Sequence, residues 1–347
     1  YLETFLLSRD VEDLGPVVAK YDELSRRIGR SLLNPIAILR TDGEGGKPSD
    51  RPLLRYLEKL PAQLKMRMLE SVDPVVIPVG LEEGARRADI LLCLLPDELQ
   101  GKIFGETISA NLREGAALCF AHGFAVAFGS VKSDRHDIVL VAPKGQGSML
   151  RKAYVEGSGL PCLVAVENDY SGRARDVALA VAWGLGCLRV GAFRTSFREE
   201  AVSDLFGEQA VLCGGATALV KRAWELLVRK GFSPEIAYFE CCQELKIIVD
   251  LFTEKGFSGM REMISGTAAY GGLEYGEKLI SKETERAMEE IFDRIDSGEF
   301  ARDWLEKSGR GGELERLRGA ERDLPMEEAG RRIRSMYGDR KNDTEGR

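Results

Sequence analysis

Two pairs of carboxylates stand at helical spacing in the second half of the chain. Glu240 and Glu244 lie four residues apart in 234–255, a stretch that the sequence predicts to be one helix. At about 100° per residue, both acids fall on one face of that helix. The same face carries three apolar side chains, Ile236, Ile247 and Leu251. Because burying an uncompensated carboxylate is unfavourable, we expect a cation beside this pair.

Asp204 and Glu208 repeat the same spacing. If their stretch is helical, Ala201 and Val211 share their face. Four carboxylates in two pairs favour a hard divalent ion, and Mg²⁺ is the natural choice because it prefers oxygen ligands and retains some waters. The alternative is that each pair lies on a solvated helix face with ordinary salt bridges. The apolar neighbours of the first pair favour the metal site.

Polar side chains follow three successive strand-like runs at the points where those runs end. Asp97 and Gln100 come after the first run, His122 after the second and Lys144 after the third. Because ligands of open α/β sheets bind at the carboxyl ends of the strands, we expect these side chains to face a ligand. Lys144, beside a glycine, suits a phosphate or a substrate oxygen. The alternative for each loop alone is a solvated turn, since turns favour these residue types.

The elements that must position these side chains alternate between strands and helices. Apolar runs of strand length occupy 90–95, 116–120, 138–141, 163–166 and 188–190, and a helix is predicted at 176–185. Such strands with helices between them are typical of a parallel sheet covered on both faces, so we predict a doubly wound α/β domain. Upstream, the sequence predicts helices at 11–33 and 52–71 and a short strand at 34–39.

Helices replace strands after about residue 195. They are predicted at 216–230, 234–255, 282–298 and 312–337. Gly231 and Gly256 end the first two, and Ser233 with Pro234 is a typical helix start. Ser265 either caps a helix or turn, or reaches a substrate carboxylate. We expect one domain at 1–194, a helical domain at 195–338 and a disordered tail at 339–347.

Composition excludes several classes of protein. The 347 residues, 44% of them hydrophobic, are enough for about two domains. The net charge of −7 argues against nucleic-acid binding, and two histidines and seven cysteines without C-x-x-C spacing argue against zinc. No apolar run is long enough for a membrane span. We expect a soluble, cytoplasmic protein with reduced thiols, in which Cys213, Cys241 and Cys242 are small buried residues.

At the acidic pairs and at the polar loops that follow the strands, the chain resembles the ketol-acid reductoisomerase family, also called acetohydroxyacid isomeroreductase. The resemblance covers about 76–338, and it is carried by ADILLCLLPDELQ, FAHGF, VAPKGQG, YVEGSGLPCLVAV, DLFGEQAVLCGG, AYFECCQELKIIVDL and GMREMISGTAAYGG. It implies an N-terminal α/β Rossmann-like domain followed by an all-α, knotted C-terminal domain. It also implies a homo-oligomer, because the family builds its site between the helical domains of two subunits.

The resemblance implies a two-step reaction on a 2-acetohydroxy acid, in valine and isoleucine synthesis. Two Mg²⁺ ions polarise the ketol while an alkyl group migrates, and NADPH then reduces the new ketone to give a 2,3-dihydroxy acid. Asp204 and Glu208 match the first metal-binding pair, with Asp204 as the bridge between the ions. Glu240 and Glu244 match the second pair, which a partner subunit contributes, and Glu244 also handles protons.

The remaining implied roles concern the substrate and the cofactor. Ser265 matches the residue that holds the substrate carboxylate. His122 and Lys144 match the active-site histidine and lysine. Three further residues match cofactor-contacting positions, and these are Asp97, Gln100 and Gly147.

The chain departs from the family in two places, and two other functions therefore stay open. Residues 1–74 do not match the family and lack its glycine-rich phosphate-binding turn. Ala269 stands where the family usually has an acid. One alternative is a non-reductive or inactive relative that keeps the metal site but has lost NADPH binding. The other is a Rossmann dehydrogenase of the 6-phosphogluconate dehydrogenase type, which needs no metal.

Overall fold

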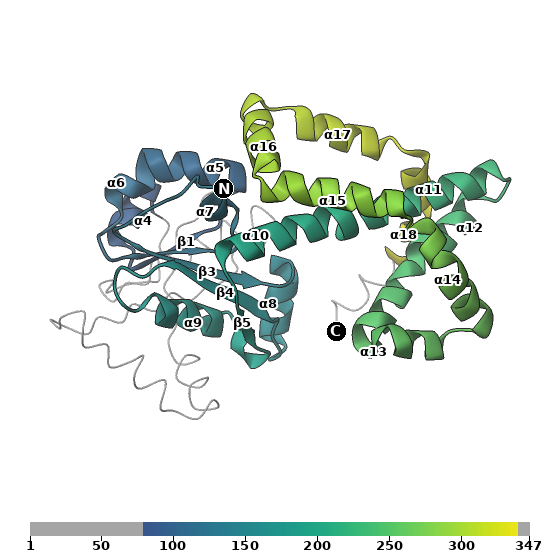
Figure 1. The fold of residues 1–347 in the computed structure, drawn as a ribbon, viewed down its shortest axis with the longest axis horizontal. Coiled ribbons are helices and arrows are strands. Elements are labelled where there is room, and N and C mark those ends of the chain that lie inside the picture. Colours follow the sequence, from purple (N-terminus) through teal and green to yellow (C-terminus); the bar gives the residue numbers. More distant parts are fainter. Residues whose placement is uncertain (1–78, 339–347) are drawn as a thin grey trace. The chain divides into compact units, whose positions relative to one another are not determined.

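The computed structural model describes residues 79–338 and divides the chain into two compact units that meet at Ala201 and Val202 (Figure 1). The helices and strand expected within 1–74, and the tail at 339–347, lie outside the described residues. Within 79–338, an α/β unit is followed by an all-helical unit, which confirms the predicted fold class. No helix in this range is both long and apolar enough to span a membrane.

Five strands form the sheet of the first unit, side by side in chain order. They are β1 (Ile90–Cys93), β2 (Ala117–Phe120), β3 (Asp137–Pro143), β4 (Cys162–Asn168) and β5 (Ala192–Arg194). β1, β2 and β3 are parallel, β4 is antiparallel to β3, and β5 is parallel to β4. The predicted all-parallel sheet is therefore wrong for its last two strands. An apolar run has the same composition whichever way it runs, so the pattern could not give its direction.

The fifth strand also lies later than predicted. Residues 188–190 fall in and after a single 3₁₀ turn, η2 (Cys187–Arg189), and the strand begins at Ala192. Gly186 adopts φ +78°, which ends the preceding helix and turns the chain. Val190 is 58% exposed. The apolar run at 188–190 is thus a surface turn and not a buried strand.

Helices cover both faces of this sheet (Figure 1). They are α4 (Leu81–Arg87), α5 (Asp97–Ile103), η1 (Phe104–Ile108), α6 (Ser109–Asn111), α7 (Phe124–Ala127), α8 (Gly147–Val155) and α9 (Ala174–Gly184). On one face, Leu118 and Leu140 pack with side chains of α4, η1 and α7. On the other face, Val139 and Val141 pack against α9, whose Val177 is buried. The helix predicted at 176–185 is confirmed as α9.

The second unit consists of helices. After α10 (Phe197–Phe206), which spans the boundary between the units, come η3 (Gly207–Leu212), α11 (Gly215–Arg229), α12 (Pro234–Tyr238), η4 (Phe239–Gln243), α13 (Leu245–Met263), α14 (Gly266–Leu279), α15 (Lys282–Asp296), α16 (Glu299–Arg310), α17 (Glu313–Arg322) and α18 (Pro325–Gly338). Trp224 of α11, Tyr238 of α12 and Ile333 of α18 form a buried apolar cluster. That cluster ties the start of the unit to its last helix.

Most predicted helices of the second unit are confirmed. α11 corresponds to 216–230 and α15 to 282–298, and Ser233 caps α12 by accepting a hydrogen bond from the Ile236 backbone N–H. The predicted single helix at 312–337 is wrong, because Pro325 has no N–H to continue a helix and starts α18 instead. The backbone breaks at Gly256, with φ +72°, but helical turns resume and continue to Met263.

Candidate active site

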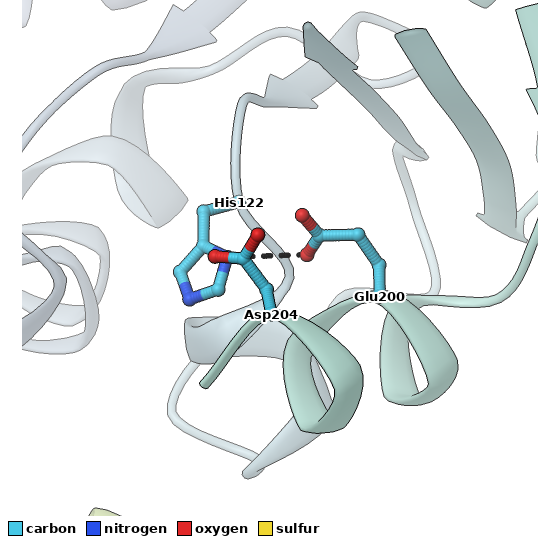
Figure 2. Close-up of side chains that lie close together, drawn as sticks. All are labelled: His122, Glu200 and Asp204. Carbon is cyan, nitrogen blue, oxygen red and sulfur yellow. Dashed lines mark hydrogen bonds and ion pairs between the residues drawn. The ribbon is translucent and has the colours of Figure 1, made fainter. Parts of the chain in front are cut away.

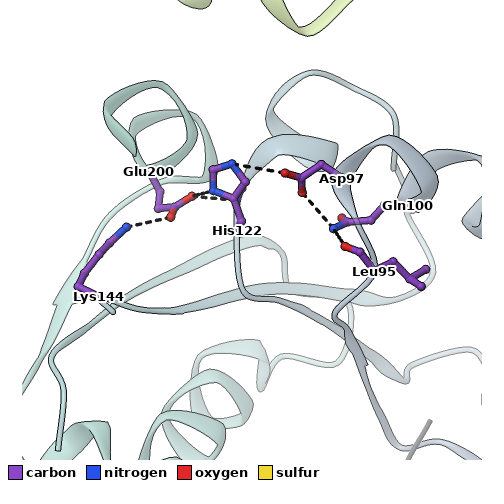
Figure 3. Close-up of polar contacts among 7 residues, drawn as sticks. Leu95, Asp97, Gln100, His122, Lys144 and Glu200 are labelled. Atoms are coloured by element: carbon purple, nitrogen blue, oxygen red, sulfur yellow. Dashed lines mark hydrogen bonds and ion pairs between the residues drawn. The ribbon is translucent and has the colours of Figure 1, made fainter. Parts of the chain in front are cut away.

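The central group of the candidate site is the carboxylate of Glu200 in α10, which is 1% exposed (Figure 3). Lys144 Nζ donates a hydrogen bond to Glu200 Oε1 at 3.1 Å. The Gly123 backbone N–H donates to Oε2 at 2.7 Å, and His122 Nδ1 lies 3.1 Å from the same oxygen. The two oxygens of this buried carboxylate thus bind groups that follow β2 and β3.

The ionisation of Glu200 follows from these contacts. Burial by itself raises the pKa of this carboxyl. The hydrogen bond and charge of His122, the charge of Lys144 and the Gly123 N–H act in the opposite direction and outweigh burial. The pKa of Glu200 is therefore below its ordinary value. The site thus contains a buried carboxylate anion that contacts a histidine and a lysine.

His122 contacts a second carboxylate on its other side. Its Nε2 lies 3.9 Å from Asp97 Oδ2, at the start of α5. Gln100 Nε2 donates to Asp97 Oδ1 at 3.1 Å and to the Leu95 carbonyl at 2.8 Å, which fixes the Asp97 side chain (Figure 3). The structure therefore brings together four of the sequence-predicted site residues, and these are Asp97, Gln100, His122 and Lys144.

Gly123 makes the close approach of α10 possible. A Cβ atom at this position would lie 2.5 Å from the Phe197 carbonyl and 3.0 Å from Glu200 Oε2. Phe197 is the first residue of α10, so any side chain at 123 would push the helix away from the His122 loop. The glycine of the FAHGF stretch is thus required for Glu200 to reach the backbone at the end of β2.

Asp204 follows Glu200 by one turn of α10 (Figure 2). One ligand atom each from His122, Glu200 and Asp204 lies within 4.8 Å of the others. The group thus sets the buried Glu200 carboxylate beside the carboxylate of Asp204, which the sequence predicts to be a metal ligand. Carboxylate oxygen is the donor that Mg²⁺ prefers.

Glu208 follows Asp204 by four residues but lies in η3, a widened turn of the π-helical type. The Cys213 backbone N–H donates to the Glu208 carbonyl at 2.7 Å, five residues back. This turn requires glycine at its end, because a Cβ on Gly214 would lie 1.9 Å from the Gln209 carbonyl oxygen. π turns are rare and recur at functional sites.

Glu240 lies within a second π turn, η4, and Glu244 directly follows that turn. Both acids are exposed, and Ile236 and Ile247 are 53% and 59% exposed. The prediction that these carboxylates lie in a buried apolar stripe is therefore wrong for the described chain. Two physical reasons apply: the π turn shifts the helical phase between 236 and 247, and the described residues leave this face uncovered.

The two remaining sequence-predicted residues lie at helix starts. Ser265 is the N-cap of α14 and is exposed, and its Oγ accepts a hydrogen bond from the Ala268 backbone N–H at 3.2 Å. This is the capping arrangement that the sequence left open as an alternative. Gly147 is the first residue of α8. Ala269 lies in the first turns of α14, where it adds no polar group.

Glu200 is the site residue that the sequence analysis missed. A signal for it was present, because Glu200, Asp204 and Glu208 repeat at a four-residue interval. Extending the acidic pair by one turn toward the N-terminus would have found it. What the spacing could not show is that this acid is buried and bound to His122 and Lys144.

The α/β unit gathers polar groups at the carboxyl ends of its strands, and the helical unit presents pairs of acids. This combination is typical of a class of nucleotide-dependent oxidoreductases. The comparisons with known proteins agree. The NADPH-binding domain of acetohydroxy acid isomeroreductase matches residues 72–191, and the C-terminal domain of ketol-acid reductoisomerase matches residues 197–338. The chain belongs to the ketol-acid reductoisomerase family.

Individual relatives support this assignment. The ketol-acid reductoisomerase (NADP(+)) of Methanothermobacter thermautotrophicus is 47% identical over 74% of this chain and 79% of its own length. The enzyme of the same name from Methanocaldococcus jannaschii is 46% identical over the same shares. A solved structure, an NADH-preferring ketol-acid reductoisomerase from an uncultured archean, is 37% identical, with a TM-score of 0.72 over 85% of each chain.

Proposed function

We propose that this chain is a ketol-acid reductoisomerase. It converts a 2-acetohydroxy acid to a 2,3-dihydroxy acid by Mg²⁺-dependent alkyl migration followed by reduction with NADPH, a step of valine and isoleucine biosynthesis. The observation that carries the proposal is the Glu200 carboxylate, which holds His122 and Lys144 one helical turn from Asp204. The family match over 72–191 and 197–338 supports both halves of the reaction.

The residues proposed to hold two Mg²⁺ ions are Asp204, Glu208, Glu240 and Glu244. Their donor set fits the ion, because all four supply carboxylate oxygens. Bound Mg²⁺ supplies Lewis-acid polarisation of the substrate oxygens and a template for their orientation. Glu240 and Glu244 are exposed and so remain open to bind a shared ion, and Glu244 is also proposed to handle a proton.

His122 and Lys144 are the proposed catalytic groups of the sheet unit. Their shared contact with Glu200 fixes both side chains before substrate arrives, which is the pre-organisation that catalysis requires. With Nδ1 directed at Glu200, the Nε2 edge of His122, which lies 3.9 Å from Asp97 Oδ2, is the edge proposed to exchange a proton. Lys144 places a positive charge where oxygen charge develops in either step.

Three residues are proposed to contact the cofactor and one the substrate. Asp97 and Gln100 lie at the start of α5 and Gly147 at the start of α8, where backbone N–H groups favour an anionic ligand. Ser265 at the start of α14 is proposed to hold the substrate carboxylate. We propose 1–194 as the cofactor domain and 195–338 as the metal and substrate domain, and the family models adjoin at this boundary.

We also propose a cytoplasmic homo-oligomer in which Glu240 and Glu244 complete the site of a second copy. Large apolar side chains are exposed along α13 and α14, and these are Ile247, Phe257, Met263, Tyr270, Leu273, Tyr275 and Leu279. Large exposed apolar side chains gathered on two consecutive helices are typical of an interface. Burial of this surface between two copies would also cover the face that carries the second acidic pair.

Consumption of NADPH with 2-acetolactate tests the proposed function. Oxidation is expected with Mg²⁺ and not with a chelator, and Asp204→Asn is expected to abolish it while circular dichroism shows a folded chain. Glu199→Gln, on the same helix but exposed, is the matched control and is expected to remain active. Folded wild-type protein that leaves NADPH unchanged in the presence of Mg²⁺, with NADH giving the same result, would refute the proposal.

A further inference from the structure

The turn that carries the second acidic pair has one side packed into the core of the helical unit. Glu240 belongs to η4 and Glu244 directly follows it, and both side chains are exposed. From the same turn, Phe239 and Cys242 pack against the buried cluster that contains Tyr238. The position of this cluster therefore helps to determine where the two carboxylates are presented.

The hydrogen bonding of η4 differs from that of the helices on either side. The Glu244 backbone N–H donates to the Phe239 carbonyl at 3.0 Å, five residues back instead of four. Because this π turn interrupts the regular hydrogen-bond ladder between α12 and α13, the ladder alone does not fix the direction of Glu240. Contacts from neighbouring helices can supply this restraint.

Tyr238 is the residue through which α18 reaches this turn. It ends α12, directly before η4, and its side chain is 6% exposed. Arg334 Nη1 of α18 donates a hydrogen bond to the Tyr238 hydroxyl at 3.0 Å. Nη2 of the same guanidinium donates to Glu327 Oε2 at 3.0 Å, seven residues earlier on α18. The arginine thus binds its own helix with one nitrogen and the tyrosine with the other.

Gly330 allows α18 to lie directly against the tyrosine ring. A Cβ at this position would lie 2.7 Å from Tyr238 Cε2 and 2.8 Å from Arg334 Nη1. Gly330 is buried and lies inside α18. Glycine is unfavourable inside a helix, so this residue is accounted for by the close packing of ring and guanidinium and not by the helix.

The short helix α12 is also held at its start. It has 5 residues, and a helix of this length is not stable without contacts to its neighbours. Arg332 Nη1 of α18 donates to Glu235 Oε1 at 2.8 Å, and Trp224 Nε1 of α11 donates to the Pro234 carbonyl at 3.0 Å. The hydrogen bond from Arg334 holds the other end of α12, at the residue that leads into η4.

We propose that Tyr238 and Arg334 are positioning residues for metal binding, because their hydrogen bond sets the direction in which Glu240 and Glu244 are presented to a divalent cation. They act through the backbone that joins Tyr238 to Glu240, and not through contact with the ion. The inference rests on the proposed function, in which the second acidic pair binds Mg²⁺. It gives α18 a role in the metal site.

Direct binding of Mn²⁺ to the full-length protein, followed by electron paramagnetic resonance, tests the proposal. Mn²⁺ suits the same carboxylate ligands as Mg²⁺. Tyr238→Phe keeps the buried ring and removes only the hydroxyl that Arg334 binds. We expect the Kd for Mn²⁺ to rise about threefold to tenfold, less than is typical when a residue that touches a metal ligand is lost. Arg334→Met should give a similar rise, and the double variant should be no worse than either, because all three lose the same bond.

Two controls separate positioning from general stability. Ile333→Val removes one methylene from the same cluster and leaves the hydrogen bond intact, so it is expected to lower the melting temperature without changing the Kd. Arg331→Met removes an exposed charge of α18 and is expected to change neither. Tyr238→Phe that binds Mn²⁺ as wild type does, or Ile333→Val that weakens binding as much as Tyr238→Phe, would overturn the proposal.

Turnover gives a second readout on the same samples. Tyr238→Phe is expected to need about threefold to tenfold more Mg²⁺ for half-maximal NADPH oxidation with 2-acetolactate, and to keep its KM for NADPH at saturating Mg²⁺. An unchanged Mg²⁺ requirement would count against the proposal.

Glu240→Gln separates a failure of this inference from a failure of the proposed function. It removes a proposed ligand and is expected to weaken Mn²⁺ binding more than Tyr238→Phe does. Glu240→Gln that binds Mn²⁺ as wild type does would refute the proposed metal site, and this inference with it. If Glu240→Gln weakens binding and Tyr238→Phe does not, the inference alone is refuted. Binding is measured without turnover, so the result does not depend on the identity of the substrate.

Discussion

Glu200 Oε1 accepts a hydrogen bond from Lys144 Nζ at 3.1 Å, in an ion pair whose carboxylate is almost wholly excluded from water. The pair joins a residue in α10 to a residue just after β3, so it holds the helix that carries Asp204 against the strand ends of the sheet. The other oxygen of the same carboxylate engages His122 and Gly123. One buried acid thus sets the positions of both proposed catalytic side chains.

Replacing this acid by its amide is expected to impair both stability and turnover. Glu200→Gln keeps the acceptor for Gly123 but removes the charge that holds Lys144 and His122. We expect a loss of about 1–3 kcal/mol in unfolding free energy and a fall of about 10–100-fold in kcat. Urea denaturation and steady-state kinetics measure the two effects. Glu199→Gln is the matched control, and equal behaviour of the two variants would contradict the role of Glu200.

The low pKa of Glu200 predicts a pH dependence of stability. Because the folded-state pKa lies below the ordinary value of 4.5, the ionised carboxylate stabilises the fold fully above that value. The stabilisation is lost as the pH falls through the folded-state pKa. The difference in unfolding free energy between wild type and Glu200→Gln should therefore stay constant above about pH 5.5 and narrow as the pH falls below 4.5. A difference that does not narrow below pH 4.5 would show that the charge of Glu200 contributes nothing.

The π turn after Asp204 is expected to tune the first metal pair. Gly214→Ala places a Cβ against the Gln209 carbonyl and should distort η3, whereas Gly207→Ala in the same turn meets nothing within 4 Å. We expect Gly214→Ala to raise the Mg²⁺ concentration for half-maximal activity and to lower the unfolding free energy by about 1–3 kcal/mol. Gly207→Ala should change neither by much. Identical Mg²⁺ titrations for both variants would show that the shape of η3 does not affect metal binding.

Mixed assemblies test whether two copies share one site. Asp204→Asn and Glu240→Gln are each expected to be inactive alone. Co-expressed with different tags and purified over both, they should regain about half of wild-type activity for a dimer, because one of two symmetric sites then receives both intact acids. Asp204→Asn with Glu208→Gln is the control, since these residues come from the same chain and no site is restored. If the mixed assembly is as inactive as each variant alone, Glu240 and Asp204 of the same chain belong to one site.

Parts of this arrangement follow from local sequence and parts do not. The polar groups after β1, β2 and β3 could be predicted, because parallel strands end at a common edge and Asp97, His122 and Lys144 each follow an apolar run. The reversal of β4 could not, since Cys162–Asn168 is equally apolar in either direction. The exposure of Glu240 depends on the π turn at η4 and on surface that the described chain leaves uncovered, and a 3.6-residue period represents neither.

A single chain is expected to carry out both the alkyl migration and the reduction. The most direct measurement uses NADPH deuterated at the transferable position, with 2-acetolactate and Mg²⁺, and identifies the product by mass spectrometry and NMR. The expected product is a 2,3-dihydroxy acid with the deuterium on C2, formed in step with NADPH consumption and absent without Mg²⁺. Accumulation of the rearranged keto acid with no NADPH consumed, or recovery of unchanged 2-acetolactate from folded protein, would show that the chain does not catalyse both steps.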